Sequence, residues 1–184
     1  KVEESRKYLV KSMQMAMFMG SAIAFGLAAV AKEFTPIFFG NEFIRSGKIV
    51  IGLAPTVLFI SWANVVRTQY LIPNAKDKIY VASVCLGAAL NISINALLIS
   101  RMGAMGAVVG TFFAEVSVAI FQTVAVRKEL EIITYLKKSG VFIIAGALMY
   151  VIVRSVANIM IVSVTSLLVE IIVGATVYLT ITIV

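Results

Sequence analysis

The chain has 184 residues, of which 61% are hydrophobic and 14% charged, and its formal net charge is +7. Uncharged apolar runs of the length found here are typical of membrane spans and exclude an ordinary soluble domain. The basic residues lie in short segments between these runs, which indicates membrane topology and excludes a nucleic-acid partner. No histidine is present, and the single cysteine, Cys85, excludes a disulfide within the chain and a CxxC metal site, so we expect no metal and no cofactor.

The first part of the chain predicts a charged lead-in followed by a membrane helix. Residues 1–11 are rich in charge, which indicates the end of a cytoplasmic loop or a helix at the membrane interface. Residues 12–31 carry no charge and are long enough, at about 1.5 Å rise per residue, to cross a hydrocarbon core of about 30 Å. Pro36 and Gly40 interrupt regular structure, so we expect residues 32–48 to form a loop.

Residues 49–70 predict a second membrane helix with an internal bend. Pro55 removes a backbone hydrogen bond near its start, and the resulting kink is either a hinge or only a bend. Ser61, Asn64 and Thr68 follow helical spacing and give the later half of this helix a polar face.

Arg67 lies next to that polar face and has two interpretations. Its side chain can extend to the membrane surface while its aliphatic stem stays in the apolar region. Alternatively it contacts a phosphate at the mouth of a cavity, because a guanidinium is always charged and pairs bidentately with phosphate oxygens.

The centre of the chain predicts a membrane hairpin, and the rest of the chain is organised around it. Residues 79–100 carry no charge, and residues 102–126 are apolar except for Glu115. Arg101 and a glycine-containing turn join the two stretches, so the helices are expected to lie antiparallel. Asn91 and Glu115 are about equally far from this turn, which places both near the middle of the bilayer.

Glu115 is the residue that points most directly to function. An ionisable side chain at the centre of a membrane helix usually faces a bundle interior or a wet cavity. Thr111 and Gln122 lie four residues before it and seven after it, so the three form one polar stripe. A separate stripe of small residues on the same helix would allow another helix to approach closely, and it consists of Gly103, Ala107, Gly110 and Ala114.

Asn91 and Asn95 are four residues apart on the preceding helix and therefore share one of its faces. Their amides either hold helices together through hydrogen bonds or line a cavity that receives a polar substrate. The sequence alone leaves both interpretations open.

The last third of the chain predicts a connector and two more helices. Residues 127–138 carry mixed charges and suit a short surface helix, and residues 139–157 and 163–184 are apolar. Arg154 and Glu170 are the two charges within these last helices. Both lie near the turn between them, so either they pair or they extend to the membrane surface.

The distribution of basic residues predicts the orientation in the membrane. With six helices, 11 of the 16 Lys and Arg residues fall on the side of residue 1, which the positive-inside rule places in the cytoplasm. The Arg101 turn is then outside and Val184 inside. The chain does not begin with Met and stops within an apolar run, so we expect a fragment of a longer protein.

Four short segments in this order resemble the C-terminal half of polysaccharide repeat-unit flippases, the Wzx-type O-antigen and capsule exporters of the multidrug/oligosaccharidyl-lipid/polysaccharide superfamily. The segments are IFFGNEFIRSGKIV (37–50), YLIPNAKDK (70–78), GAALNISINALLI (87–99) and MGAMGAVVGT (102–111). The resemblance extends over about residues 1–127, and beyond them only the hydropathy agrees.

The resemblance implies an all-α integral membrane protein with 12 to 14 helices in two lobes around a central cavity. Residues 1–127 would be the last four helices of the second lobe, and residues 128–184 two additional C-terminal helices. The family flips oligosaccharides linked to undecaprenyl pyrophosphate across the cytoplasmic membrane of bacteria, by alternating access coupled to H⁺ or Na⁺. Glu115 would then be the ion-coupling carboxylate, and Asn64, Asn91 and Asn95 would contact sugar hydroxyls.

Two other substrates suit the same superfamily, namely organic cations exported by a multidrug antiporter and the lipid II of a lipid II flippase. A membrane enzyme such as a glycosyltransferase is a different class. The chemistry of such an enzyme needs clustered acidic or basic groups in a sizeable loop. The two longest loops expected here, residues 32–48 and 127–138, are short. We therefore expect a transporter that contacts membrane lipids, and no enzyme.

Overall fold

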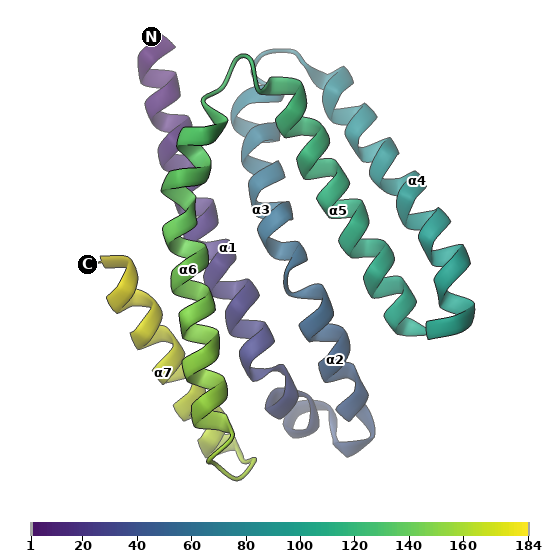
Figure 1. Cartoon of the computed structure of the whole chain (residues 1–184), viewed down its shortest axis with the longest axis vertical. Helices are drawn as coiled ribbons and strands as arrows, with labels where there is room; N and C mark the ends of the chain where they lie inside the picture. Colours follow the sequence, from purple (N-terminus) through teal and green to yellow (C-terminus); the bar gives the residue numbers. More distant parts are fainter. Residues whose placement is uncertain (1, 184) are drawn as a thin grey trace.

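The computed structural model describes residues 2–183 and, over that range, contains helices and no strands (Figure 1). Five helices are long and apolar enough to cross a membrane, and the number rises to six if the bent pair forms one span. The prediction of an all-α multi-pass membrane protein with about six spans is therefore confirmed. The elements are α1 (Val2–Phe39), η1 (Asn41–Phe43), α2 (Ile44–Leu53), α3 (Thr56–Val66), η2 (Arg67–Leu71, a π-helical turn), α4 (Asp77–Met102), α5 (Ala104–Val126), α6 (Ile132–Ala157) and α7 (Val164–Ile183).

The kink at Pro55 is present and separates α2 from α3. The two helical segments on either side are bent by 41°. Proline has no backbone N–H and its ring crowds the preceding turn, so the helix cannot continue straight through it. The bend is confirmed, and its role as a hinge stays a prediction.

Several helices are longer than the sequence predicted, and α2 begins at Ile44 rather than at residue 49. Residues 32–39, expected as a loop, form the last two turns of α1, with Pro36 inside the helix, and the helix ends only before Gly40, whose φ is +91°. The lead-in is also part of α1, and residues 132–138 are the first turns of α6 rather than a separate surface helix. Charged turns at the end of an apolar span extend past the hydrocarbon region, so charge marked the limit of the span and not of the helix.

Helix α1 lies between the two halves of the bundle. It packs against α2 and α3 on one side and against α6 and α7 on the other, while α4 and α5 form a hairpin that contacts α3 through α5. The core around Met13 includes Trp62 of α3 and Val126 of α5. A second core, with Ala29, Met149 and Tyr178, joins α1 to α6 and α7.

Arg154 does not pair with Glu170 as the sequence suggested it could. Its Nη1 donates to Glu33 Oε2 at 2.7 Å and to the carbonyl oxygen of Ala29 at 2.9 Å. The reason is topological: the end of α6 packs against the end of α1, so Glu33, over a hundred residues away in the chain, is nearer to the guanidinium.

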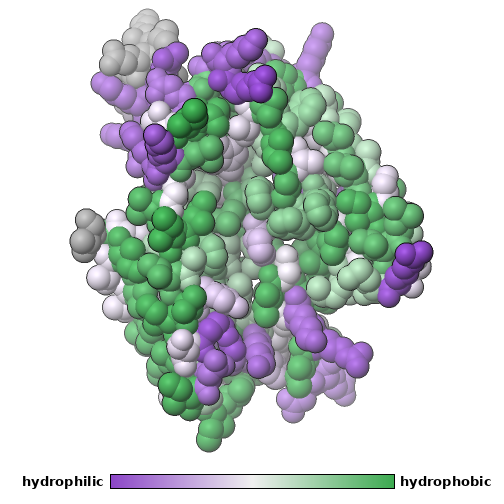
Figure 2. All heavy atoms as spheres, in the orientation of Figure 1, coloured by the Kyte–Doolittle hydropathy of each residue, from purple (hydrophilic) through white to green (hydrophobic). Residues whose placement is uncertain are grey.

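The connections fall at two opposite ends of the bundle, as an alternating membrane topology requires. The N-terminal end of α1 and the links before α4 and α6 lie at one end in Figure 1, and the α4–α5 and α6–α7 turns lie at the other. Figure 2 shows hydrophilic residues gathered at both ends and an apolar band between them. Lys1 and Val184, which entered the orientation argument, lie outside the described residues.

Candidate functional site

Small residues bring α4 and α5 together and set the geometry of the site. Gly103 makes the turn between them with a φ of +57°, a backbone conformation that residues other than glycine rarely adopt. A Cβ on Gly106 would lie 2.6 Å from the backbone carbon of Leu98, so the two helices touch at this point. Ala114 packs in the same way against Gly87. The predicted close approach is confirmed at Gly110 and Ala114, and Gly106, which the predicted stripe did not include, lies against the backbone of Leu98.

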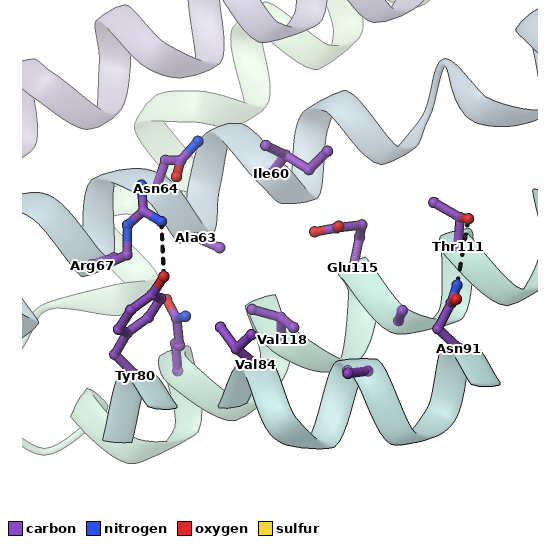
Figure 3. Close-up of a pocket in the computed structure, with 14 residues that line it drawn as sticks. Ile60, Ala63, Asn64, Arg67, Tyr80, Val84, Asn91, Thr111, Glu115 and Val118 are labelled. Atoms are coloured by element: carbon purple, nitrogen blue, oxygen red, sulfur yellow. Dashed lines mark hydrogen bonds between the residues drawn. The ribbon is translucent and has the colours of Figure 1, made fainter. Parts of the chain in front are cut away.

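A cavity of about 430 Å³ opens between α3, α4 and α5. Since α3 and α4 both pack against α5, the side chains that project from α5 between them reach into this space (Figure 3). Fourteen residues line it: Ile60, Ala63, Asn64, Arg67, Tyr80, Val84, Gly87, Ala88, Asn91, Thr111, Ala114, Glu115, Val118 and Gln122. Six of the seven candidate transport residues are therefore brought together, namely Asn64, Arg67, Asn91, Thr111, Glu115 and Gln122.

Glu115 points from α5 into the middle of this cavity (Figure 3) and is half-buried. Within the described part of the chain, no basic side chain forms an ion pair with its carboxyl group. A carboxyl group in such surroundings is free to bind a cation or a proton. Thr111 and Gln122 line the cavity on either side of it, as the polar stripe predicted.

The end of the cavity next to Glu115 is formed by Asn91 and Thr111. The Asn91 amide donates to Thr111 Oγ1 at 3.5 Å, a long contact. Asn95, predicted to line the cavity, does not line it; its amide donates instead to Asn91 Oδ1 at 2.9 Å. A Cβ on Gly110 would lie 2.1 Å from Asn95 Oδ1, so Asn95 sits in the helix–helix contact and orients Asn91.

Arg67 lies at the opposite end of the cavity (Figure 3). It is half-buried in the π-helical turn η2, its Nη1 donates to the Tyr80 hydroxyl at 3.3 Å, and its Nε is buried without a hydrogen-bond partner. Asn64 lines the wall one turn before it. The polar face predicted for this helix divides: Ser61 packs against Gly20 of α1, and only Asn64 reaches the cavity.

Comparison with known proteins shows what this chain is related to. A protein of Shigella dysenteriae named "Putative O-antigen transporter" is 30% identical over 125 residues, which are 68% of this chain. The chain is similar to that protein over these residues. It spans about a third of that relative's length, since the match covers 31% of it. No family model and no solved structure matches the chain.

Two residues that contact the candidate site residues were not singled out from the sequence. Tyr80 holds Arg67, and Ser83, fully buried on α4, accepts a hydrogen bond from the Gln122 amide at 2.9 Å. A signal for Tyr80 was present: it lies eleven residues before Asn91, three helical turns away on the same face. Gln122 is itself almost fully buried, so its amide ties α5 to α4 at the edge of the cavity.

The cavity therefore has a carboxyl group in its middle, amide and hydroxyl groups at one end, and a guanidinium at the other. Such a set can bind a small cation or proton, hydrogen-bond hydroxyl groups, and attract an anion.

Proposed function

We propose that the full-length protein is a transporter that flips lipid-linked oligosaccharide, of the undecaprenyl-pyrophosphate type, across the bacterial cytoplasmic membrane. The observation that carries the proposal is the cavity in which Glu115, Asn91 and Arg67 lie together between membrane helices. The name of the Shigella dysenteriae relative supports the same class of substrate. A lipid carrier that remains in the membrane while its sugars cross requires a polar path between apolar helices.

Glu115 is the group proposed to couple transport to an ion. Because it has no ion-pair partner among residues 2–183, its charge can be neutralised by H⁺ or Na⁺. Binding of the ion removes a charge from the cavity, and this favours a state in which the helices around it close. Thr111 and Gln122 line the cavity on the same helix face as Glu115.

The two ends of the cavity suit the two parts of the proposed substrate. Asn91 and Asn64 offer amide donors and acceptors, which match sugar hydroxyl groups. Arg67 offers a guanidinium, which matches pyrophosphate oxygens. Asn95 acts through Asn91 in this scheme, by fixing the orientation of its amide.

In this proposal residues 1–127 are the last four helices of the second lobe of a protein with 12 to 14 helices, and residues 128–184 add two helices. The N-terminal end of the chain faces the cytoplasm, in keeping with the excess of basic residues on that side. The bend at Pro55 is the hinge about which α2 moves relative to α3 during alternating access.

Complementation tests this proposal. The full-length gene is expressed in bacteria that lack their own repeat-unit flippase, with several repeat-unit types, and surface polysaccharide is measured. We expect restoration by the wild type and by Glu42→Gln, which changes an exposed acid, and loss with Glu115→Gln at matched membrane expression. If Glu115→Gln transports with an unchanged pH dependence, the coupling role is wrong. If no repeat unit reaches the surface, the substrate class is wrong.

An organic-cation antiporter is the second candidate, and the unpaired carboxyl group of Glu115 favours it. A cationic drug could bind there among the apolar walls formed by Ile60, Val84 and Val118. Direct binding of a fluorescent organic cation to the purified protein, abolished in Glu115→Gln, would support this reading. A lipid II flippase is separated from both by survival of cells depleted of their own lipid II flippase.

A further inference from the structure

A second buried carboxyl group lies outside the cavity, between α1, α6 and α7. The Glu170 side chain of α7 is 1% exposed, and neither of its carboxyl oxygens has a hydrogen-bond partner in the described chain. It shares the buried face of α7 with Leu167, Gly174 and Tyr178. This face is otherwise mostly apolar. Gly174, one turn along, packs against Val153 and Met149 of α6.

The charged groups that act on Glu170 come from the two helices packed against α7. They are Glu33 of α1, which is 5% exposed, and Arg154 of α6. Arg154 is already engaged, because its Nη1 donates to Glu33 Oε2 at 2.7 Å and to the Ala29 carbonyl at 2.9 Å. Two carboxyl groups therefore face one guanidinium, and the guanidinium neutralises only Glu33.

The N-terminus of α7 does not stabilise a negative charge on Glu170. The helix begins at Val164, and its first turn is capped by Ser163 and Ser166, each of which accepts a backbone N–H of the other. Glu170 lies beyond that turn, where the field of the helix terminus has fallen off. An ionised carboxylate buried without hydrogen bonds is strongly unfavourable, whereas the neutral acid is far less so.

We propose that Glu170 holds a proton at neutral pH and forms, with Glu33 and Arg154, a proton-binding centre separate from the cavity. With one proton on Glu170 the cluster has one positive and one negative charge and is neutral. Movement of α7 toward Arg154 would pair the guanidinium with Glu170 and leave Glu33 without its cation, so that the proton passes from Glu170 to Glu33. Proton binding and the packing of α7 on α1 and α6 are thereby linked. This centre does not depend on the identity of the transported substrate.

Infrared spectroscopy of the purified full-length protein in lipid tests the proposal, because a protonated carboxyl group has a C=O stretching band that a carboxylate lacks. We expect Glu170→Gln to lose one such band at neutral pH, and Glu42→Gln, an exposed control, to lose none. The same band must disappear when Glu170→Gln is made in a Glu115→Gln background, which separates this centre from the cavity. A spectrum unchanged by Glu170→Gln would overturn the proposal.

Replacing Arg154 gives an independent result. In Arg154→Gln the Glu33 carboxyl loses its cation, so we expect a second protonated band, which the double variant Glu33→Gln/Arg154→Gln removes. No gain of a band would show that Glu33 is not held ionised by Arg154. If added Na⁺ abolishes the Glu170 band at constant pH, the site binds a metal cation and the proton assignment is wrong.

Chemical labelling keeps the proposal testable if the variants fail to fold. A hydrophobic carbodiimide reacts with protonated carboxyl groups in apolar surroundings, and labelled positions are mapped by mass spectrometry of the wild-type protein in lipid. We expect label on Glu170, decreasing as the pH is raised, and none on Glu33. Label on Glu33 with none on Glu170 would overturn the assignment.

Discussion

Arg67 lies over the ring of Tyr80, with the guanidinium carbon 5.3 Å from the ring centroid and Nη1 3.3 Å from the hydroxyl oxygen. This contact joins the π-helical turn after α3 to the first turn of α4. It holds the guanidinium at the end of the cavity, although a long side chain at this depth could otherwise extend to the membrane surface.

The first prediction tests this arrangement. Tyr80→Phe keeps the ring below the guanidinium and removes one hydrogen bond, which is a net loss of about 0.5–1.5 kcal/mol, so we expect transport to fall several-fold. Arg67→Ala removes the cation and should reduce transport more strongly, whereas Tyr8→Phe, at an exposed tyrosine, should have no effect. Transport of lipid-linked oligosaccharide by the full-length protein in vesicles measures this. Normal transport by Arg67→Ala would show that the guanidinium takes no part.

Much of the fold followed from the sequence because membrane spans are set by apolar length and glycine-dependent turns. The hairpin around Gly103 and the bend at Pro55 were predicted for local reasons that tertiary contacts do not change. The lengths of α1 and α6 were not predicted, because a helix can continue past the membrane with charged residues. Pro36 did not end α1, because it lies near the end of the helix, where a proline is accommodated.

The candidate site was partly predictable for a similar reason. Glu115, Thr111 and Gln122 share one helix face whatever surrounds them, so their common position followed from spacing. The partners of Arg67 and Arg154 could not be predicted from spacing, because each partner depends on which helices are neighbours. Asn95 was wrongly predicted to line the cavity because it shares a helix face with Asn91. That face is wide enough to include both the edge of the cavity, where Asn91 lies, and the contact with Gly110, where Asn95 lies.

A second prediction concerns the closest approach of α4 and α5. A Cβ added at Gly106 would lie 2.6 Å from the Leu98 backbone carbon, and backbone atoms cannot move aside as a flexible side chain can. We expect Gly106→Ala to destabilise the protein by about 1–3 kcal/mol. At Gly140 of α6 a Cβ would meet nothing within 4 Å, so Gly140→Ala should be neutral or stabilising. Thermal unfolding in detergent compares the two, and equal losses would contradict the packing described.

A third prediction concerns the ion pair that joins the links before α4 and α6. Lys76 contacts Glu129, which also accepts a hydrogen bond from the Tyr70 hydroxyl. The hydrogen bond from Lys76 lowers the pKa of the Glu129 carboxyl, and the same bond raises the pKa of Lys76. Their stabilising effect should therefore be present at neutral pH.

The two pKa shifts set the pH window in which this effect is lost. The Glu129 contribution should decline as the pH falls from its ordinary value of 4.5 through the lowered pKa, and the Lys76 contribution as the pH rises from 10.5 through the raised one. Both groups are exposed, so added salt should weaken the effect at every pH. The difference in melting temperature between wild type and Glu129→Gln, measured against pH, checks this. A difference that persists in strong acid would show that the contact is not ionic.

The last prediction concerns Glu33 and Arg154, which form a largely buried ion pair between α1 and α6. Removing one partner of such a pair leaves a buried charge, so we expect Arg154→Met to destabilise the protein by about 3–5 kcal/mol at neutral pH. The double variant Glu33→Gln/Arg154→Met should recover a large part of this loss, because it removes both charges. Arg101→Met, at an exposed turn, should change stability by less than about 0.5 kcal/mol.

Thermal unfolding of the wild type, Glu33→Gln, Arg154→Met and the double variant forms a cycle from which the coupling between the two residues is obtained. Additive losses in the double variant would mean that the pair contributes only packing. In that case the charge of Arg154 would also not determine which of the two carboxyl groups, Glu33 or Glu170, carries the proton.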